Sequence, residues 1–135
     1  MSSSNDEAYS MIDRLRGWID DANATMSANR EKIARLEEAS SLLKQEYENS
    51  ERTKSELTNY DYYADYLWSG NKRNDYDSKK EDAATKADTF DDAILTARQS
   101  IETKKSELSA SNFDLAGCVE SWGSQIGDWW GKITN

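Results

Sequence analysis

An apolar repeat with nothing to interrupt it constrains the fold most. Proline is absent from the chain, and Gly17 is the one glycine between Ala8 and Leu67. Because proline and glycine are the residues that most often break helices, no residue in this stretch obliges a helix to end. Alternating steps of three and four connect Ile12, Leu15, Ile19, Ala22, Met26, Asn29, Ile33, Leu36, Ser40, Leu43, Tyr47, Ser50, Lys54, Leu57, Asp61, Ala64 and Trp68. This heptad spacing predicts one long helix with a single, mostly apolar stripe.

A second register of the same kind begins after Gly70. It passes through Tyr76, Lys80, Ala83, Ala87, Phe90, Ile94, Ala97, Ile101, Lys104 and Leu108. Two long helices with a short connector form an antiparallel helical hairpin. We therefore predict an all-α, elongated, coiled-coil-like two-helix hairpin that forms a single domain. Its expected parts are a flexible N-terminus and helix start (1–10), a first helix (about 11–67), a turn (68–74), a second helix (about 75–110) and a Trp/Gly-rich tail (111–135).

Polar residues occupy several positions that should be core. They are Asn29, Ser40, Ser50, Lys54, Asp61, Lys80 and Lys104. Polar seam residues cost stability but fix register and partner choice. Two interpretations remain open: these side chains lie at the edge of a shallow seam and reach solvent, or the hairpin is one component of a larger helical assembly.

The last segment, "FDLAGCVESWGSQIGDWWGKITN", differs in composition from the two arms. One helical face carries Leu115, Val119, Trp122, Ile126, Trp129 and Ile133, and a neighbouring stripe carries Gly123, Gly127 and Gly131. Because each glycine costs an isolated helix about 1 kcal/mol, we expect this tail to fold only against a surface. That surface is the first arm near Tyr9, Ile12 and Trp18, the helices of a partner, or a membrane interface. The membrane is the weakest alternative, since interfacial helices favour a basic polar face and Lys132 alone opposes the acidic residues of the tail.

Composition argues against several classes of function. The formal net charge of −9 disfavours nucleic-acid binding, which needs clustered lysine and arginine. Histidine is absent and Cys118 is the single cysteine, so the usual general base and the usual zinc ligands are missing. We therefore expect no enzymatic activity, no catalytic residues, no metal site and no cofactor. The start "MSSSNDEAYS" shows no Sec-type leader and no apolar run approaches a membrane span, so we expect a cytoplasmic protein or one exported by another route.

The stretch "YLWSGNKRNDYDSKKEDA" places a Trp-x-Gly turn, Trp68 and Gly70, at the strong break between the two registers. With the hairpin pattern over about 10–110, it resembles the WXG-type proteins of bacterial type VII secretion. Within that group the chain is most similar to the small helical proteins encoded beside LXG-domain toxins in Gram-positive bacteria. Their aromatic-x-x-x-acid export signal is not found after the second helix here, since its matches, Tyr9 with Asp13 and Tyr47 with Glu51, lie in the first arm. Either the Trp-rich tail replaces that signal or the partner supplies it.

The resemblance implies a non-enzymatic targeting protein. It would bind the helical leader of an LXG-type toxin, alone or with a second small hairpin protein, for recognition by the secretion ATPase, and it would stay in the cytoplasm or leave with its partner. Residues expected in the partner-binding seam are Leu36, Leu43, Leu57, Phe90, Ile94 and Ile101. Trp122, Ile126, Trp129 and Trp130 are the candidate docking or export residues of the tail. Two other functions stay open: a self-associating coiled-coil module, and a protein that docks on membranes through its tail.

Overall fold

The computed structural model contains two helices, α1 (Ser2–Leu67) and α2 (Gly70–Lys132). It describes the backbone of residues 2–67 and 70–133 and the side chains of residues 5–57 and 73–133. No described residue lies in a strand, and the two helices pack against each other, so the predicted all-α hairpin is confirmed. Within the expected turn motif, Gly70 is the first residue of α2, whereas Trp68 and Ser69 lie outside the described residues.

Both helices are longer than the segments expected for them. α1 begins at Ser2, within the segment expected to be flexible, and α2 includes 70–74 and the whole Trp/Gly-rich segment as far as Lys132. The extension of α2 has a physical reason in the contacts described below. An apolar face that packs on α1 offsets the helix-breaking tendency of the tail glycines.

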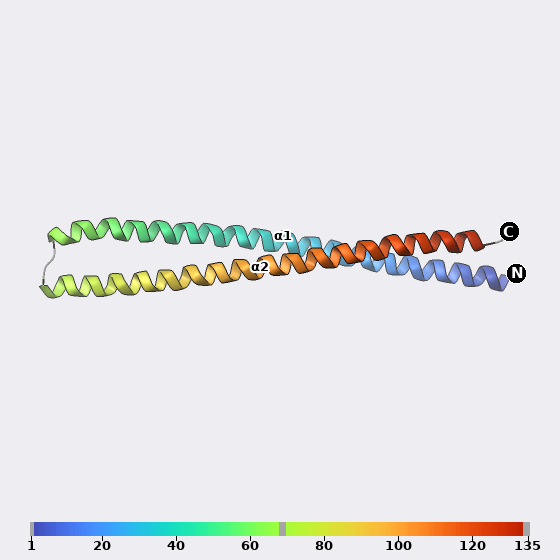
Figure 1. The fold of residues 1–135 in the computed structure, drawn as a ribbon, viewed down its shortest axis with the longest axis horizontal. Coiled ribbons are helices and arrows are strands. Elements are labelled where there is room, and N and C mark those ends of the chain that lie inside the picture. The colour runs from blue at the N-terminus through green and yellow to red at the C-terminus, as the bar shows by residue number, and fades with distance from the viewer. Residues whose placement is uncertain (1, 68–69, 134–135) are drawn as a thin grey trace. The chain divides into compact units, whose positions relative to one another are not determined.

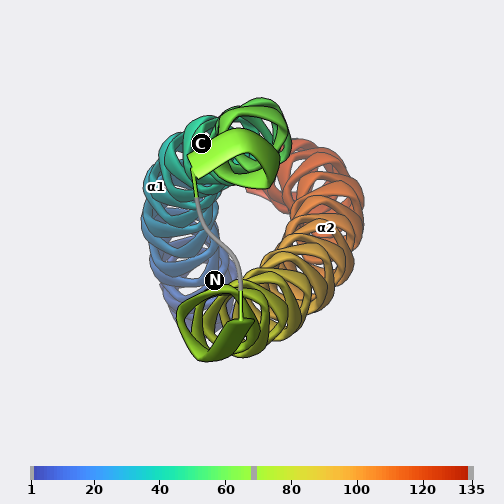
Figure 2. The ribbon, with the colours of Figure 1, turned by 90° about the vertical axis from the view of Figure 1, so that its left-hand side faces the viewer.

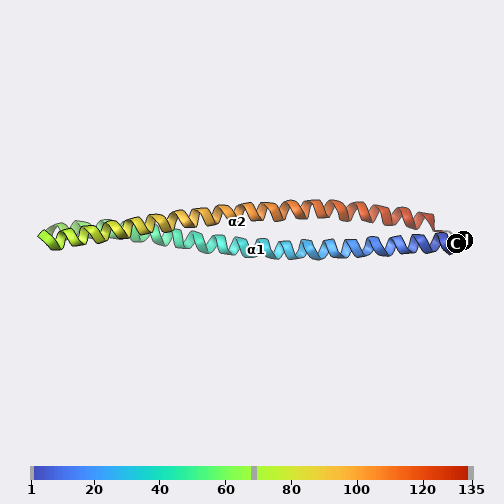
Figure 3. The ribbon, with the colours of Figure 1, turned by 90° about the horizontal axis from the view of Figure 1, so that it is seen from below.

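The chain divides into two compact units, and each contains part of both helices. Unit 1 comprises Met1–Arg35 and Lys104–Asn135, and unit 2 comprises Leu36–Thr103. In each unit the segment of α1 lies beside the segment of α2, as the three views in Figures 1, 2 and 3 show. The hairpin pairing can therefore be described within each unit separately.

Unit 1 has a largely apolar seam. Its fully or nearly fully buried apolar side chains are Ala8, Ile12, Leu15, Ala22, Met26 and Leu108. Four of them lie in the predicted heptad, namely Ile12, Leu15, Ala22 and Met26, and Leu15 is 0% exposed. Burying a side chain of the size of Ile12 or Leu15 stabilises a fold by about 1.5–3 kcal/mol, so this cluster dominates the stability of unit 1.

Unit 2 has a shallower and more polar seam. Ile94 is its one buried apolar residue among those described, and Ser40 and Asp91 are buried polar residues. The larger apolar side chains of its seam are otherwise half-buried, among them Leu36, Leu43, Tyr47, Leu57 and Ile101. Burial in unit 2 is incomplete because each helix meets only one other helix there.

The register of α2 differs from the sequence prediction around Phe90. Phe90 is 46% exposed, whereas the adjacent Asp91 is 5% exposed. The inward positions Ala83, Ala87 and Asp91 follow in two successive steps of four, and such a stutter shifts the inward stripe by one residue. After it, Lys105 is half-buried and Lys104, expected in the seam, is exposed. Phe90 and Lys104 therefore lie outside the seam between α1 and α2.

Replacing Leu15 with alanine tests the importance of the unit 1 cluster. We expect Leu15→Ala to lower the free energy of unfolding by about 2–5 kcal/mol, since it leaves a cavity in a fully buried site. The matched control is Leu42→Ala, which truncates a leucine that is 56% exposed on the same helix and should change stability by less than about 0.5 kcal/mol. Urea unfolding followed by circular dichroism measures both values. Equal effects of the two substitutions would show that the seam is misassigned.

Candidate partner-binding surface

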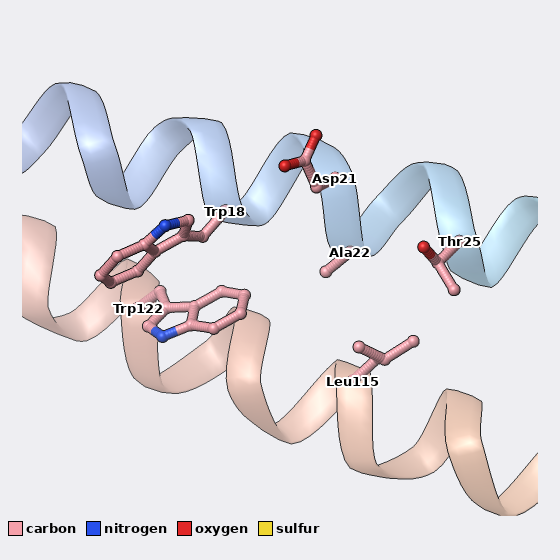
Figure 4. A pocket seen from close by; sticks show the side chains of 6 residues that line it. All are labelled: Trp18, Asp21, Ala22, Thr25, Leu115 and Trp122. Carbon is pink, nitrogen blue, oxygen red and sulfur yellow. The ribbon is translucent and has the colours of Figure 1, made fainter.

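An apolar groove opens between α1 and α2 in unit 1. The rings of Trp18 and Trp122 meet at one end of it, with centroids 5.7 Å apart and an interplanar angle of 53° (Figure 4). The groove has a volume of about 430 Å³. Its lining consists of Trp18, Asp21, Ala22, Thr25, Leu115 and Trp122. Asp21 is the one charged side chain in this lining.

The groove follows from side-chain size along α1. Ala22 occupies an inward heptad position, is 4% exposed and forms part of the floor, while Thr25 stands one turn further along the helix. These small side chains leave a hollow beside the large indoles of Trp18 and Trp122. Trp18 is nevertheless 46% exposed, so water reaches a large apolar surface at this point.

A second set of ring contacts holds the end of α2 on α1. Tyr9 and Trp130 meet edge to face, with ring centroids 5.8 Å apart and planes at 85°. The guanidinium of Arg16 lies 5.8 Å from the Trp130 ring, a cation–π distance. Of the surfaces considered for the tail, the first arm is the one against which the structure places it. Ile126 and Trp129 are half-buried, and Trp130 remains 44% exposed.

The glycine stripe of the tail plays no part in this packing. A Cβ atom built at Gly123, Gly127 or Gly131 meets nothing within 4 Å apart from its own helix. No close approach of a second backbone therefore explains these glycines within the described chain.

The buried polar residue of the unit 1 seam is satisfied across the two helices. Asn29 Nδ2 donates to Asn112 Oδ1 at 2.9 Å, and Asn112 Nδ2 donates to the Met26 carbonyl oxygen at 3.2 Å. A buried asparagine in a coiled-coil seam favours the one pairing that satisfies its amide. Asn29 and Asn112 therefore help to fix the antiparallel register of unit 1.

The seam of unit 2 contains a layer of charged side chains around Lys54, here called the charged layer. Lys54 Nζ lies 2.6 Å from Asp91 Oδ2, 2.7 Å from Asp88 Oδ1 and 3.2 Å from Glu51 Oε1. Hydrogen bonds to Asp88 and then Asp91 raise the pKa of Lys54 above its ordinary value. The hydrogen bond from Lys54 holds the pKa of Asp91 below its usual range, although burial acts in the opposite direction. A further polar contact in this seam joins Arg98 Nε to Ser40 Oγ at 3.3 Å.

The residues expected to bind a partner have different degrees of exposure. Ile94 is buried in the seam between α1 and α2, and Phe90 is exposed. Four are half-buried: Leu36, Leu43, Leu57 and Ile101. Only Phe90 is thus fully free of the internal seam, and contact of any of the six with a partner stays a prediction.

Sequence reasoning missed two kinds of residue. Leu42, Leu95 and Phe113 are large apolar side chains that are 45–80% exposed, and the inward stripe did not include them. Asp91 was missed as the buried partner of Lys54. Counting back in sevens from Val119 in the tail register reaches Asp91, so the sequence did contain this signal.

Two features are absent from the described part of the chain. It has no group of three or more cysteine, aspartate and glutamate side chains arranged to hold a metal ion. Neither α1 nor α2, as far as their residues are described, contains an apolar stretch of membrane-spanning length.

Comparison with known families identifies the chain at the level of its family. The sequence model of the YwqH-like family matches residues 10–129. Because this match covers most of the chain, the protein belongs to the YwqH-like family. Neither a curated protein nor a solved structure gave a significant match.

The charged layer of unit 2 predicts a specific dependence of stability on pH. Because the pKa of Asp91 is lower in the folded chain, its pairing stabilises the fold above the unfolded-state pKa of about 3.9 and is lost as the pH falls through the folded value. For Lys54, whose folded pKa is raised, the contribution is present below about pH 10.4 and is lost as the pH rises through the folded value. Stability should therefore be nearly constant at neutral pH and fall in acid.

Thermal melts of the wild type and of Asp91→Asn between about pH 2 and 7 check this expectation. The variant should lose melting temperature at pH 7 and show a smaller further loss in acid. Asp92→Asn, which changes an exposed neighbour with the same change in charge, is the control and should follow the wild type. An acid loss of equal size in all three proteins would contradict a special role for Asp91.

Proposed function

We propose that this member of the YwqH-like family is a non-enzymatic partner protein that binds the helical leader of an LXG-type toxin and promotes its export by type VII secretion. The observation that carries the proposal is a hairpin whose single seam leaves large apolar side chains uncovered in both units. These side chains are Tyr9, Trp18, Leu42, Phe90, Leu95, Phe113 and Trp130, each at least 44% exposed.

Exposure of this kind is costly for a chain that stays alone. Each Å² of apolar surface removed from water is worth about 25 cal/mol, so a partner that covers such side chains gains binding free energy. A third helix that packs beside the hairpin could cover those on its side by the same heptad geometry that pairs α1 with α2. A helical partner is therefore the kind of molecule that this surface suits best.

The identity of the partner comes from the sequence. The resemblance to the small proteins encoded beside LXG toxins names the helical leader of such a toxin, with or without a second small hairpin protein. In this proposal Phe90 contacts the partner directly, since it already lies outside the internal seam. The secretion ATPase recognises the assembled bundle, and the Trp-rich tail is the candidate export signal.

Self-association is the second candidate, because the same exposed side chains suit a second copy of the chain. The acidic net charge of −9 opposes it, since two copies bring like charges together. The oligomeric state of the chain alone separates the two functions. A monomer that becomes a stoichiometric complex with the toxin leader supports the first function and excludes the second.

Co-expression with the LXG-domain protein of the same gene neighbourhood tests the proposal. We expect the two chains to co-elute in size-exclusion chromatography with light scattering. Phe90→Ser should weaken the complex about tenfold, as expected for the loss of one aromatic anchor. Thr89→Ser is the control, because it makes a small change at the exposed position next to Phe90 and should leave binding unchanged.

The outcomes distinguish the proposed function from the proposed role of Phe90. Failure of the wild-type chains to co-elute would rule out the proposed function. Co-elution that survives Phe90→Ser as fully as it survives Thr89→Ser would keep the function but remove Phe90 from the interface.

A further inference from the structure

The groove lined by Trp18 and Trp122 resembles the hole that receives a side chain in knobs-into-holes packing. In coiled coils a side chain of one helix inserts into a hole made by residues of its neighbours. Here the hole is made by two helices, with Trp18, Ala22 and Thr25 from α1 and Leu115 and Trp122 from α2 (Figure 4). At about 430 Å³ it is of the size of sites that hold large apolar groups.

The floor of the groove belongs to the best-packed part of unit 1. Ala22 is 4% exposed, Met26, one turn further along α1, is 6% exposed, and Leu15, two turns before Ala22, is 0% exposed. A site supported by fully packed neighbours needs little rearrangement to bind, which favours affinity. The groove is therefore a preformed feature of the folded hairpin.

Charge around the groove is acidic. Asp21 lines it on α1, and Asp114 is exposed immediately before the lining residue Leu115 on α2. No lysine or arginine belongs to the lining. A partner that places a cation beside its apolar knob would pair with Asp21 and avoid the repulsion that an acidic flank would meet.

We propose that this groove binds a third helix from a partner protein, which inserts a bulky aliphatic side chain beside the paired rings of Trp18 and Trp122, over Ala22, and pairs a flanking lysine or arginine with Asp21. The proposal rests on the proposed function for the helical nature of the partner and adds the chemistry that the partner must have. The tail of the chain is excluded as the occupant, since the ring of Trp122 already packs on Trp18. A second copy is disfavoured by its acidic charge of −9.

Cys118 provides a reporter for occupation of the groove. It is exposed and is the single cysteine of the chain. On α2 it lies three residues after Leu115 and four before Trp122, so it shares their face of the helix within one turn. A helix seated in the groove should slow the reaction of Cys118 with a maleimide and shift the tryptophan emission to shorter wavelength.

The test uses two synthetic helices, each three heptads long with leucine at the a and d positions. One carries lysine and the other glutamate at the flanking e and g positions. We expect the lysine peptide to bind the full chain and to protect Cys118 in proportion to the fraction bound, and the glutamate peptide to do neither. Calorimetry supplies the affinity and maleimide labelling supplies the location.

Two pairs of variants distinguish binding in the groove from nonspecific electrostatic attraction to the chain. Asp21→Lys should weaken the lysine peptide about fivefold or more, while Asp20→Lys, which makes the same change in charge at an exposed neighbour outside the lining, should have less than about twofold effect. Thr25→Phe fills the groove from an exposed position and should abolish binding. Thr96→Phe adds the same ring at an exposed position of unit 2 and should leave binding unchanged.

Three results would overturn the proposal: no binding of the lysine peptide, equal weakening by Asp21→Lys and Asp20→Lys, or undiminished binding to Thr25→Phe. The toxin proposal fails separately. If the lysine peptide binds the groove but no LXG-domain protein co-elutes, the proposal for the groove stands and the proposed function in toxin export fails. If the toxin leader co-elutes equally with Thr25→Phe and the peptide does not bind, the toxin role stands and the groove is not its site.

Discussion

A helix in a two-helix hairpin has one neighbour, so a single seam must bury all the apolar surface that the helix carries. In unit 1 the seam buries a cluster around Ile12 and Leu15, both at most 1% exposed, but leaves Trp18 46% and Phe113 80% exposed. In unit 2 the seam buries less, because Ile94 alone among the described apolar residues is buried there. Because each helix has only one neighbour, part of its apolar surface stays exposed. A partner helix would bind to this exposed surface.

The polar layers give the seam its specificity. Lys54 with Asp91, and Asn29 with Asn112, pair across the helices in only one alignment of α1 and α2. A buried charge pair contributes little net stability, but the loss of one partner is costly. A helix that slipped in register, or an incorrect helix in place of α2, would leave such a group unpaired. Polar residues in the seam thus weaken the hairpin slightly and discriminate strongly against wrong pairings.

Periodicity alone was sufficient to predict the hairpin, since α1 keeps one heptad register and contains no proline. It failed at Phe90 because an apolar residue was preferred to the adjacent aspartate, whose burial is offset mainly by Lys54 on the facing helix. The continuation of α2 through the tail glycines was likewise undecided, because it depends on contacts such as that of Tyr9 with Trp130. The Trp18–Trp122 groove arises from side-chain sizes on two helices together, which a one-dimensional pattern does not contain.

The central claim is that the firmly packed seam of unit 1 supports the groove, while the seam of unit 2 opens more readily. Native-state hydrogen exchange of the chain alone tests it most directly, because each amide reports the free energy of its own opening. We expect the slowest amides near Leu15, Ala22 and Leu108, and exchange faster by about tenfold or more near Leu43 and Ala87. Uniform protection along both helices, or slower exchange in unit 2, would contradict the claim.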